Sequence, residues 1–245
     1  MAENSKIDWC DHTFNPWIGC TKVSPACDNC YAEIWDKRFK GDSWGHGRPR
    51  RITSEANWVK PFQWNAKAKK EGKRYKVFCA SLADVFDKEV SDEYRDRIFA
   101  MIALTPNLDW LVLSKRPKIA REYLKSIGKD PNTDRICLSA KKWYPKKGII
   151  SFGKSTQGPY ISNLWVGTTV ENQTMVNLRI PILLETPAAG HFLSCEPLLE
   201  SIDLSKWLKS PIFNDQDLNK IDWVIVGGES GAKARPMHPG WVREI

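Results

Sequence analysis

The sequence lacks any apolar run of the roughly 18 residues that a membrane-spanning helix requires. Its first stretch, MAENSKIDWCDHTF, also lacks the apolar core of a secretory signal. No Ser–His–Asp, phosphate-loop or dinucleotide-fold pattern is present, which argues against the ordinary hydrolase, kinase and dehydrogenase classes. We therefore expect a cytoplasmic protein that has no membrane partner and belongs to another functional class.

Internal repeats and low-complexity tracts are absent as well, and the composition is that of a folded protein. Of the 245 residues, 42% are hydrophobic and 27% are charged. The formal net charge of +8 and the pI of about 9.1 favour a polyanionic partner only weakly, because many basic proteins bind none. Twelve tryptophans exceed what a core of this size requires, so we expect some of them to line a site or stack on a flat ligand.

Three of the seven cysteines form a close group, separated by six and then by two residues. They are Cys20, Cys27 and Cys30. In a reducing cytosol, grouped cysteines are typical metal ligands, and soft thiolates select zinc or an iron–sulfur cluster. A structural zinc site needs a fourth ligand, for which Cys10, His12 and His46 are the nearest candidates. A [4Fe–4S] cluster on three cysteines would leave one iron open, and a chance grouping of plain thiols is a third interpretation.

Six short segments, most of them with β-branched or aromatic residues, predict strands. They cover residues 12–18, 76–80, 109–113, 164–168, 191–195 and 222–226. Helical patterns separate most of them, at 91–104, 117–127 and 172–184. Strands that alternate with helical crossovers pair in parallel. We therefore predict one α/β domain over residues 1–245, a partial TIM-like (β/α)6 barrel with a long basic insertion near 130–163.

Polar residues follow every predicted strand, and the carboxyl ends of parallel strands meet on one face of an α/β barrel. We therefore expect these residues to share a site, with the cysteine loop after the first strand. After the later strands come Ser81 and Asp84, then Lys115, then Glu171 and Asn172, then Glu196, and finally Gly227, Gly228, Glu229 and Ser230.

Some of these positions admit two interpretations. Lys115 and the adjacent Arg116 suit a carboxylate or phosphate ligand, or a salt bridge that caps the barrel rim. Glu171 and Asn172 suit ribose hydroxyls, although an N-cap of the following helix explains the pair equally well. Glu196 precedes a proline, which favours an extended backbone and directs the side chain toward the barrel mouth.

Two basic segments break the regular order of strands and helices. Residues 37–51 form a glycine-rich loop beside the cysteines, and residues 141–147 read KKWYPKK. Lysines can neutralise phosphates while aromatic rings stack on unpaired bases, so we predict nucleic-acid contacts from the second segment. The residues concerned are Lys141, Lys142, Trp143 and Tyr144. A solvated loop with both aromatic rings turned inward is the alternative.

The segment FNPWIGCTKVSPACDNCYAE at 14–33 ends its cysteine motif in C-x-x-C-Y and is similar to the cluster loop of radical S-adenosylmethionine enzymes. The whole chain resembles the three-cysteine-motif proteins of phages and bacteria, a group of unassigned function placed near that superfamily. The other segments that carry the resemblance are VFCASLADVF (77–86), LVLSKRP (111–117), LWVGTTVENQ (164–173), FLSCEPLLESID (192–203) and WVIVGGESGAKARPMHPGWVR (223–243).

The resemblance implies that the three cysteines bind three irons of a [4Fe–4S] cluster and that S-adenosylmethionine chelates the fourth iron. An external electron donor would then drive formation of a 5′-deoxyadenosyl radical. The basic segments add the expectation of a nucleic-acid or nucleotide-like substrate. We assign catalytic roles to Lys115, Glu171 and Glu196, and cofactor contacts to Ser81, Asp84, Asn172, Gly227, Gly228, Glu229 and Ser230. A non-catalytic nucleic-acid-binding protein stapled by zinc or a cluster is the alternative, and a protein partner would also explain the charge.

The chain departs from the enzyme pattern in two places. Six residues separate its first two cysteines, where most radical S-adenosylmethionine enzymes have three. Their glycine-glycine-glutamate follows the second strand, whereas here Gly227, Gly228 and Glu229 follow the sixth. Related chains continue with another apolar strand, so we expect the end at Ile245 to be naturally short or that of a fragment.

Overall fold

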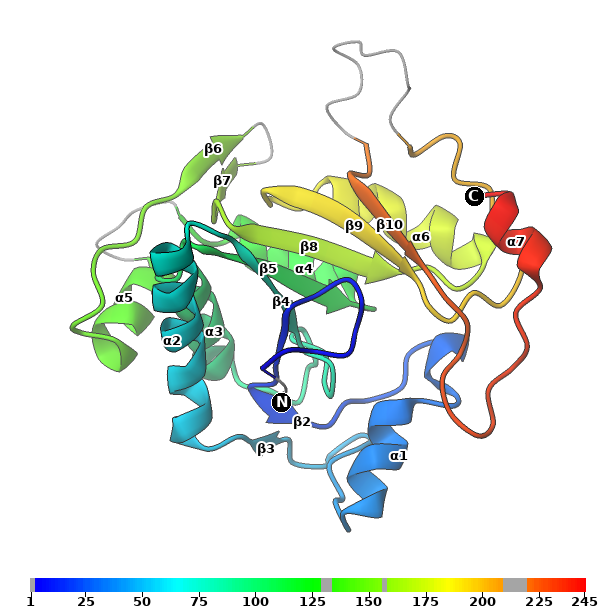
Figure 1. Cartoon of the computed structure of the whole chain (residues 1–245), viewed down its shortest axis with the longest axis horizontal. Helices are drawn as coiled ribbons and strands as arrows, with labels where there is room; N and C mark the ends of the chain where they lie inside the picture. Colours follow the sequence, from blue (N-terminus) through cyan, green and yellow to red (C-terminus); the bar gives the residue numbers. More distant parts are fainter. Residues whose placement is uncertain (1–2, 129–133, 156–157, 209–219) are drawn as a thin grey trace.

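The computed structural model describes residues 3–128, 134–155, 158–208 and 220–245. Its centre is a six-stranded sheet in which every neighbouring pair of strands is parallel (Figure 1). In spatial order the strands are β1 (His12–Phe14), β4 (Tyr75–Cys79), β5 (Leu108–Ser114), β8 (Leu164–Thr169), β9 (Gly190–Cys195) and β10 (Trp223–Val226). Spatial order equals chain order, so all carboxyl ends lie along one edge. The predicted α/β class and the six parallel strands are confirmed.

Helices flank this sheet and connect its strands. They are α1 (Tyr31–Arg38), α2 (Glu55–Glu71), α3 (Asp92–Ala103), α4 (Pro117–Lys125), α5 (Arg135–Trp143), α6 (Gln173–Leu184) and α7 (Pro239–Arg243). Two small antiparallel sheets pair β2 (Trp17–Ile18) with β3 (Arg51–Ile52) and β6 (Gly153–Ser155) with β7 (Gly158–Tyr160). In the described ranges, no helix combines the length and the apolar character needed to cross a bilayer.

The structure differs from the sequence prediction in three elements. The strand expected at 12–18 is divided, because Asn15 turns away from the sheet and its side chain binds the Leu82 amide at 2.7 Å. Helix α2 is missing from the prediction, since Pro61 lies inside it and its buried face is rich in tryptophan. The insertion near 130–163 contains α5 and the β6–β7 hairpin. The Asp134 side chain caps α5 by accepting hydrogen bonds from two amides of its first turn.

One face of the sheet packs against helices α2, α3, α4 and α6. Alternate strand residues, such as Val77, Trp110 and Val166, are fully buried there because successive side chains of a strand point to opposite faces. The Phe14 ring meets Trp58 and Trp110 edge-on, at centroid distances of 5.5 and 5.7 Å. This face carries the main apolar core.

The other face of the sheet is covered by the amino-terminal segment. The Trp9 ring lies 4.6 Å from Phe78 on β4 and 6.4 Å from Trp223 on β10. The Lys76 ammonium of β4 also lies over the Trp223 ring, at 4.8 Å. Because β5, β8 and β9 separate β4 from β10 in the sheet, these contacts require strong curvature. The amino-terminal segment therefore fills the concave side (Figure 1).

Candidate functional site

The three grouped cysteines lie in the loop that leaves β2 at the carboxyl edge. Cys20 follows β2, Cys27 ends a short 3-10 turn (Pro25–Cys27), and Cys30 directly precedes α1. Cys27 is buried and the other two are half-buried, and all three are free thiols. Side chains that follow the other strands of the sheet hold this loop in place.

Arg116, which follows β5, links the start of the cysteine loop to the end of β4. Its guanidinium donates to the Asp84 carboxylate at 2.8 Å, to the Thr21 carbonyl at 2.7 Å and to the Cys20 sulfur at 3.5 Å. Asp84 is also bound by the Ser114 hydroxyl at 2.8 Å and by the Lys115 amide at 3.1 Å. Both charged side chains are about 8% exposed, so the ion pair is largely shielded from water.

A second buried pair reinforces this contact. Arg50 donates to both oxygens of Asp87, at 3.2 and 3.1 Å, and each side chain is only 1% exposed. Asp87 in turn accepts the Thr21 amide at 3.0 Å. Burial by itself would raise the pKa of Asp87, but the Glu89 amide and the charges of Arg116 and Arg50 hold it below its ordinary value. The carboxylate therefore stays ionised and keeps the loop fixed.

Cys20 is a protonated thiol in this arrangement. Burial raises its pKa to about 12, the Asp84 charge adds to the increase, and Arg116 opposes it. Only the thiolate binds metals, so ligation by Cys20 would have to displace this proton. Among the residues that the structure describes, Arg116 is the group that lowers the pKa of Cys20 and so favours the thiolate.

Glu171, which follows β8, holds the middle of the cysteine loop. The side chain is fully buried, and one carboxylate oxygen accepts from Arg179 at 2.9 Å. The other oxygen accepts the Ala26 amide, adjacent to Cys27, at 3.4 Å. Its backbone carbonyl also accepts the Leu199 amide at 2.9 Å. A buried charge with these partners positions the loop.

Glu229, which follows β10, holds the end of the loop. Arg235 forms an ion pair with it, and Asn29 donates to it at 2.9 Å. The Arg235 guanidinium also reaches the Pro25 carbonyl at 2.8 Å. The hydrogen bond from Arg235 is the main reason that the pKa of Glu229 falls to about 2. The segment after β10 thus clamps residues 25–29.

Glu196, which follows β9, lies over Gly227. A Cβ atom at Gly227 would come within 2.3 Å of a Glu196 carboxylate oxygen, so only glycine leaves room for the observed position. Burial raises the pKa of Glu196, and a hydrogen bond from Trp9 partly offsets the increase. Nearby, the Tyr31 hydroxyl donates to the Ser81 carbonyl at 2.6 Å, and burial together with Cys30 and Glu196 raises its pKa. This corner thus holds two acidic groups whose pKa values are raised.

The other predicted residues have more ordinary environments. Ser81 accepts from Asn15 at 2.9 Å. The Asn172 side chain caps α6 by accepting the Met175 amide at 2.9 Å, which is the N-cap interpretation. Lys115 is half-buried, and Gly228 and Ser230 are exposed.

The segment 141–147 is remote from this edge in the fold. Lys141, Lys142 and Trp143 belong to the last turn of α5, and Tyr144 follows them. Lys142 pairs with Glu93 at 2.6 Å, and Trp143 stacks on the Arg97 guanidinium at 4.1 Å. Both aromatic rings are therefore turned inward.

The conformation does not fit a metal centre. Across residues 3–128, 134–155, 158–208 and 220–245, no group of three or more His, Cys, Asp and Glu side chains is arranged to hold a metal ion. The candidate fourth ligands of a zinc site are engaged elsewhere: His12 stacks on Trp64 at 4.4 Å, and Cys10 packs in the cluster around Phe78. His46 lies on the surface beside Glu89.

Several residues of this site were missed from the sequence. They are Tyr31, Arg50, Asp87, Arg179 and Arg235. Two of them carried a usable signal: Tyr31 is the last residue of the C-x-x-C-Y motif, and Arg179 interrupts an apolar helical pattern. The others gain their roles from partners remote in sequence.

The fold and the site define an α/β protein with a cysteine loop fastened at the carboxyl edge of a parallel sheet. The chain belongs to the family described as "Protein of unknown function (DUF5131)", whose model matches residues 4–245. No curated protein and no solved structure shows a significant match.

Replacing Arg116 is expected to destabilise the protein strongly. Arg116→Leu removes the cation from the buried Asp84 carboxylate and should lower the free energy of unfolding by about 3–5 kcal/mol. Arg121→Leu is the control, because its ion pair with Glu185 is far more exposed and should cost at most about 1 kcal/mol. Urea denaturation measures both values, and equal losses would contradict the assignment.

Replacing Gly227 is expected to displace Glu196. Gly227→Ala places a methyl group on the carboxylate, whereas at Gly228 the nearest atom to a new Cβ is 3.7 Å away. Carboxyl ¹³C NMR, assigned with Glu196→Gln, should show the raised pKa of Glu196 in the wild type and in Gly228→Ala. In Gly227→Ala the carboxylate moves toward water and its pKa should decrease. Identical titrations of the two variants would refute the contact.

The clamp formed by Glu229 should weaken in acid. Its pKa is about 2 in the folded protein against an ordinary 4.5, so its stabilisation is complete above pH 4.5 and disappears as the pH falls toward 2. The difference in unfolding temperature between wild type and Glu229→Gln should shrink over that window. The exposed Glu122→Gln serves as control, and a difference that is constant with pH would exclude the clamp.

Proposed function

We propose that this protein is an iron–sulfur protein of the radical S-adenosylmethionine type that acts on a nucleic-acid or nucleotide-like substrate. Its sheet would be a partial (β/α)6 barrel, and the carboxyl edge would be its site. S-adenosylmethionine and an external electron donor would be its co-reactants.

The observation that carries the proposal is the threefold fastening of the cysteine loop. Cys20 contacts Arg116 after β5, the residue before Cys27 binds Glu171 after β8, and the residue before Cys30 binds Glu229 after β10. Each contact joins positions about 100 to 200 residues apart in the chain. Burying charged groups costs desolvation free energy that their pairing only partly offsets, and here the pairs position one short loop that carries three thiols.

The order and curvature of the strands support the barrel. In the main sheet, each strand lies beside the one that precedes it along the chain. The curvature of the sheet brings residues of β4 and β10 into contact with the same ring, that of Trp9. In such an arrangement the loops after the strands surround one mouth, where a cofactor would be enclosed.

The chain's own residues would bind and orient rather than carry out the redox chemistry. A bound cluster would supply one-electron reduction of S-adenosylmethionine. Arg116 would favour the Cys20 thiolate, and Glu171 would hold the Cys27 segment. Because the three thiols do not form a ligand set in this conformation, loading requires them to turn toward one another.

Anaerobic reconstitution with iron and sulfide tests the proposal. We expect about four irons and four sulfides per chain, with the visible absorption of a cluster. Cys27→Ala should lose them, whereas Cys137→Ala, which removes a buried thiol on α5, should retain them. S-adenosylmethionine should bind more tightly to the loaded protein than to the apo protein.

Two results would overturn this proposal. A stoichiometric zinc without sulfide would favour the zinc-stapled binding protein, and equal affinity of apo and loaded protein for S-adenosylmethionine would exclude chelation by an open iron.

A further inference from the structure

Three aromatic side chains form an exposed row on α1, the helix that follows the cysteine loop. They are Tyr31, Trp35 and Phe39, and they are 47%, 38% and 61% exposed. Residues spaced four apart lie along one face of a helix, so we call this row the aromatic ridge. Trp35 and Phe39 contact each other at a centroid distance of 4.8 Å, and the exposed fractions are what this contact leaves open.

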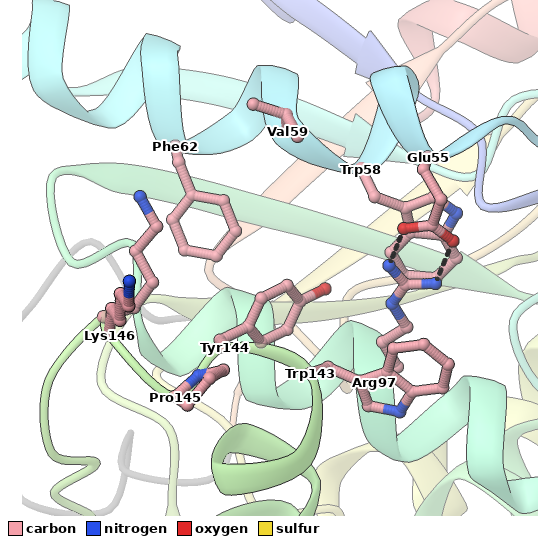
Figure 2. A pocket seen from close by; sticks show the side chains of 10 residues that line it. Glu55, Trp58, Val59, Phe62, Arg97, Trp143, Tyr144, Pro145 and Lys146 are labelled. Carbon is pink, nitrogen blue, oxygen red and sulfur yellow. Dashed lines mark hydrogen bonds and ion pairs between the residues drawn. The ribbon is translucent and has the colours of Figure 1, made fainter.

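The aromatic ridge differs from the other aromatic residues of the protein. In the part of the chain that the structure describes, every other Phe, Trp and Tyr is buried or half-buried. A cavity of about 300 Å³ lies between α2, α3 and the turn that follows α5, and its rings contact other groups of the protein (Figure 2). There Trp143 stacks on Arg97 at 4.1 Å, and Phe62 contacts the Tyr144 ring at 5.0 Å and the Lys147 ammonium at 4.8 Å. The aromatic surface open to a ligand is therefore that of the ridge.

The segment that carries the aromatic ridge is also cationic. Residues 31–51 contain six Lys or Arg side chains and three Asp or Glu side chains. Each of the three carboxylates is paired with a cation of the same segment, in the pairs Glu33–Lys37, Asp36–Arg51 and Asp42–Arg48. Arg38 and Lys40, on either side of Phe39 in the chain, are exposed and form no ion pair with any residue that the structure describes. Unneutralised positive charge thus lies next to the most exposed ring.

The aromatic ridge begins at the carboxyl edge of the sheet. Tyr31 directly follows Cys30, and its hydroxyl donates to the Ser81 carbonyl after β4 at 2.6 Å. Phe39 lies at the other end of α1, about 12 Å farther along the helix at a rise of about 1.5 Å per residue. Helix α1 lies at the periphery of the molecule (Figure 1). A ligand bound along the ridge therefore extends from the periphery to the carboxyl edge.

We propose that the aromatic ridge binds a single-stranded nucleic acid and directs it toward the carboxyl edge. Unpaired bases stack on Phe39 and Trp35, and the adjacent phosphates meet Arg38 and Lys40. The unpaired cations select a polyanion, and rings form most of the exposed apolar surface of α1, with Ile34 as its one exposed aliphatic side chain. The inference rests on the nucleic-acid substrate class of the proposed function, and it is independent of the metal centre.

Fluorescence anisotropy with a labelled single-stranded DNA of about twelve nucleotides and mixed sequence tests the aromatic ridge. The purified protein is used without added iron or sulfide, so that the outcome does not depend on the metal centre. Phe39→Ala and Phe39→Leu should each weaken binding about tenfold because both remove the stacking surface, whereas Phe39→Tyr should preserve it. Leu178→Ala shortens an exposed apolar side chain on α6 and is the control, with an affinity equal to that of the wild type.

The dependence of the affinity on salt tests the two cations. Arg38→Gln with Lys40→Gln should weaken binding and reduce the slope of log affinity against log salt by about 1.4, since each phosphate contact contributes about 0.7. Lys69→Gln with Lys70→Gln makes the same charge change in the last turn of α2 and should leave the slope unchanged. If both pairs reduce the slope equally, the attraction is general and the ridge is excluded.

Three further outcomes would overturn the inference. If the wild type binds and the Phe39 variants bind equally well, the ridge is not the site and the substrate class stands. If Phe39→Leu binds like the wild type while Phe39→Ala is weakened, the contact is apolar and base stacking is excluded. If the wild type fails to bind at about 50 mM salt, both the ridge and the nucleic-acid substrate class are overturned, and a protein partner becomes the explanation of the exposed rings.

Discussion

The structure of the carboxyl edge depends on the hydrogen bonds and the ion pair of the Arg116 guanidinium. This guanidinium touches a carboxylate after β4, a backbone carbonyl of the cysteine loop and the Cys20 sulfur, and it lies almost wholly out of water. A planar cation with several fixed donors can hold three segments in one geometry, which a lysine at the same place could not do. Because the surrounding carboxylates are buried, the arrangement is stable only while the cation is present. The position of Cys20 therefore follows from a residue almost a hundred positions later in the chain.

The curvature of the sheet is the second constraint. Trp9 bridges β4 and β10 on the concave side and also donates a hydrogen bond to Glu196. The amino-terminal segment, which fills the concave side of the sheet, therefore also affects the pKa of Glu196. Burial against this segment and Gly227 raises the pKa of Glu196.

The carboxyl edge and the cavity beside α2 differ in how they are built. The carboxyl edge is built mainly from ion pairs, of which Arg116–Asp84, Arg50–Asp87 and Arg179–Glu171 are buried. The cavity beside α2 has a different character, with aromatic and apolar walls and two exposed lysines, Lys146 and Lys147, at its rim. The first arrangement holds a loop in place, whereas the second packs aromatic rings around the buried Arg97 guanidinium.

The sequence by itself predicted six strands and their parallel pairing, because apolar segments that alternate with helical crossovers pair in that way, whereas the order of the strands in the sheet came from the structure. It also determined which residues follow each strand, and hence the list of side chains near the carboxyl edge. Only the tertiary structure decided how these side chains are used. Asn172 caps α6, Glu171 pairs with Arg179 and the Ala26 amide, and the rings of segment 141–147 turn inward onto Arg97. The physical reason is that hydrogen-bond and ion-pair partners far apart in sequence are chosen by packing, which no local pattern records.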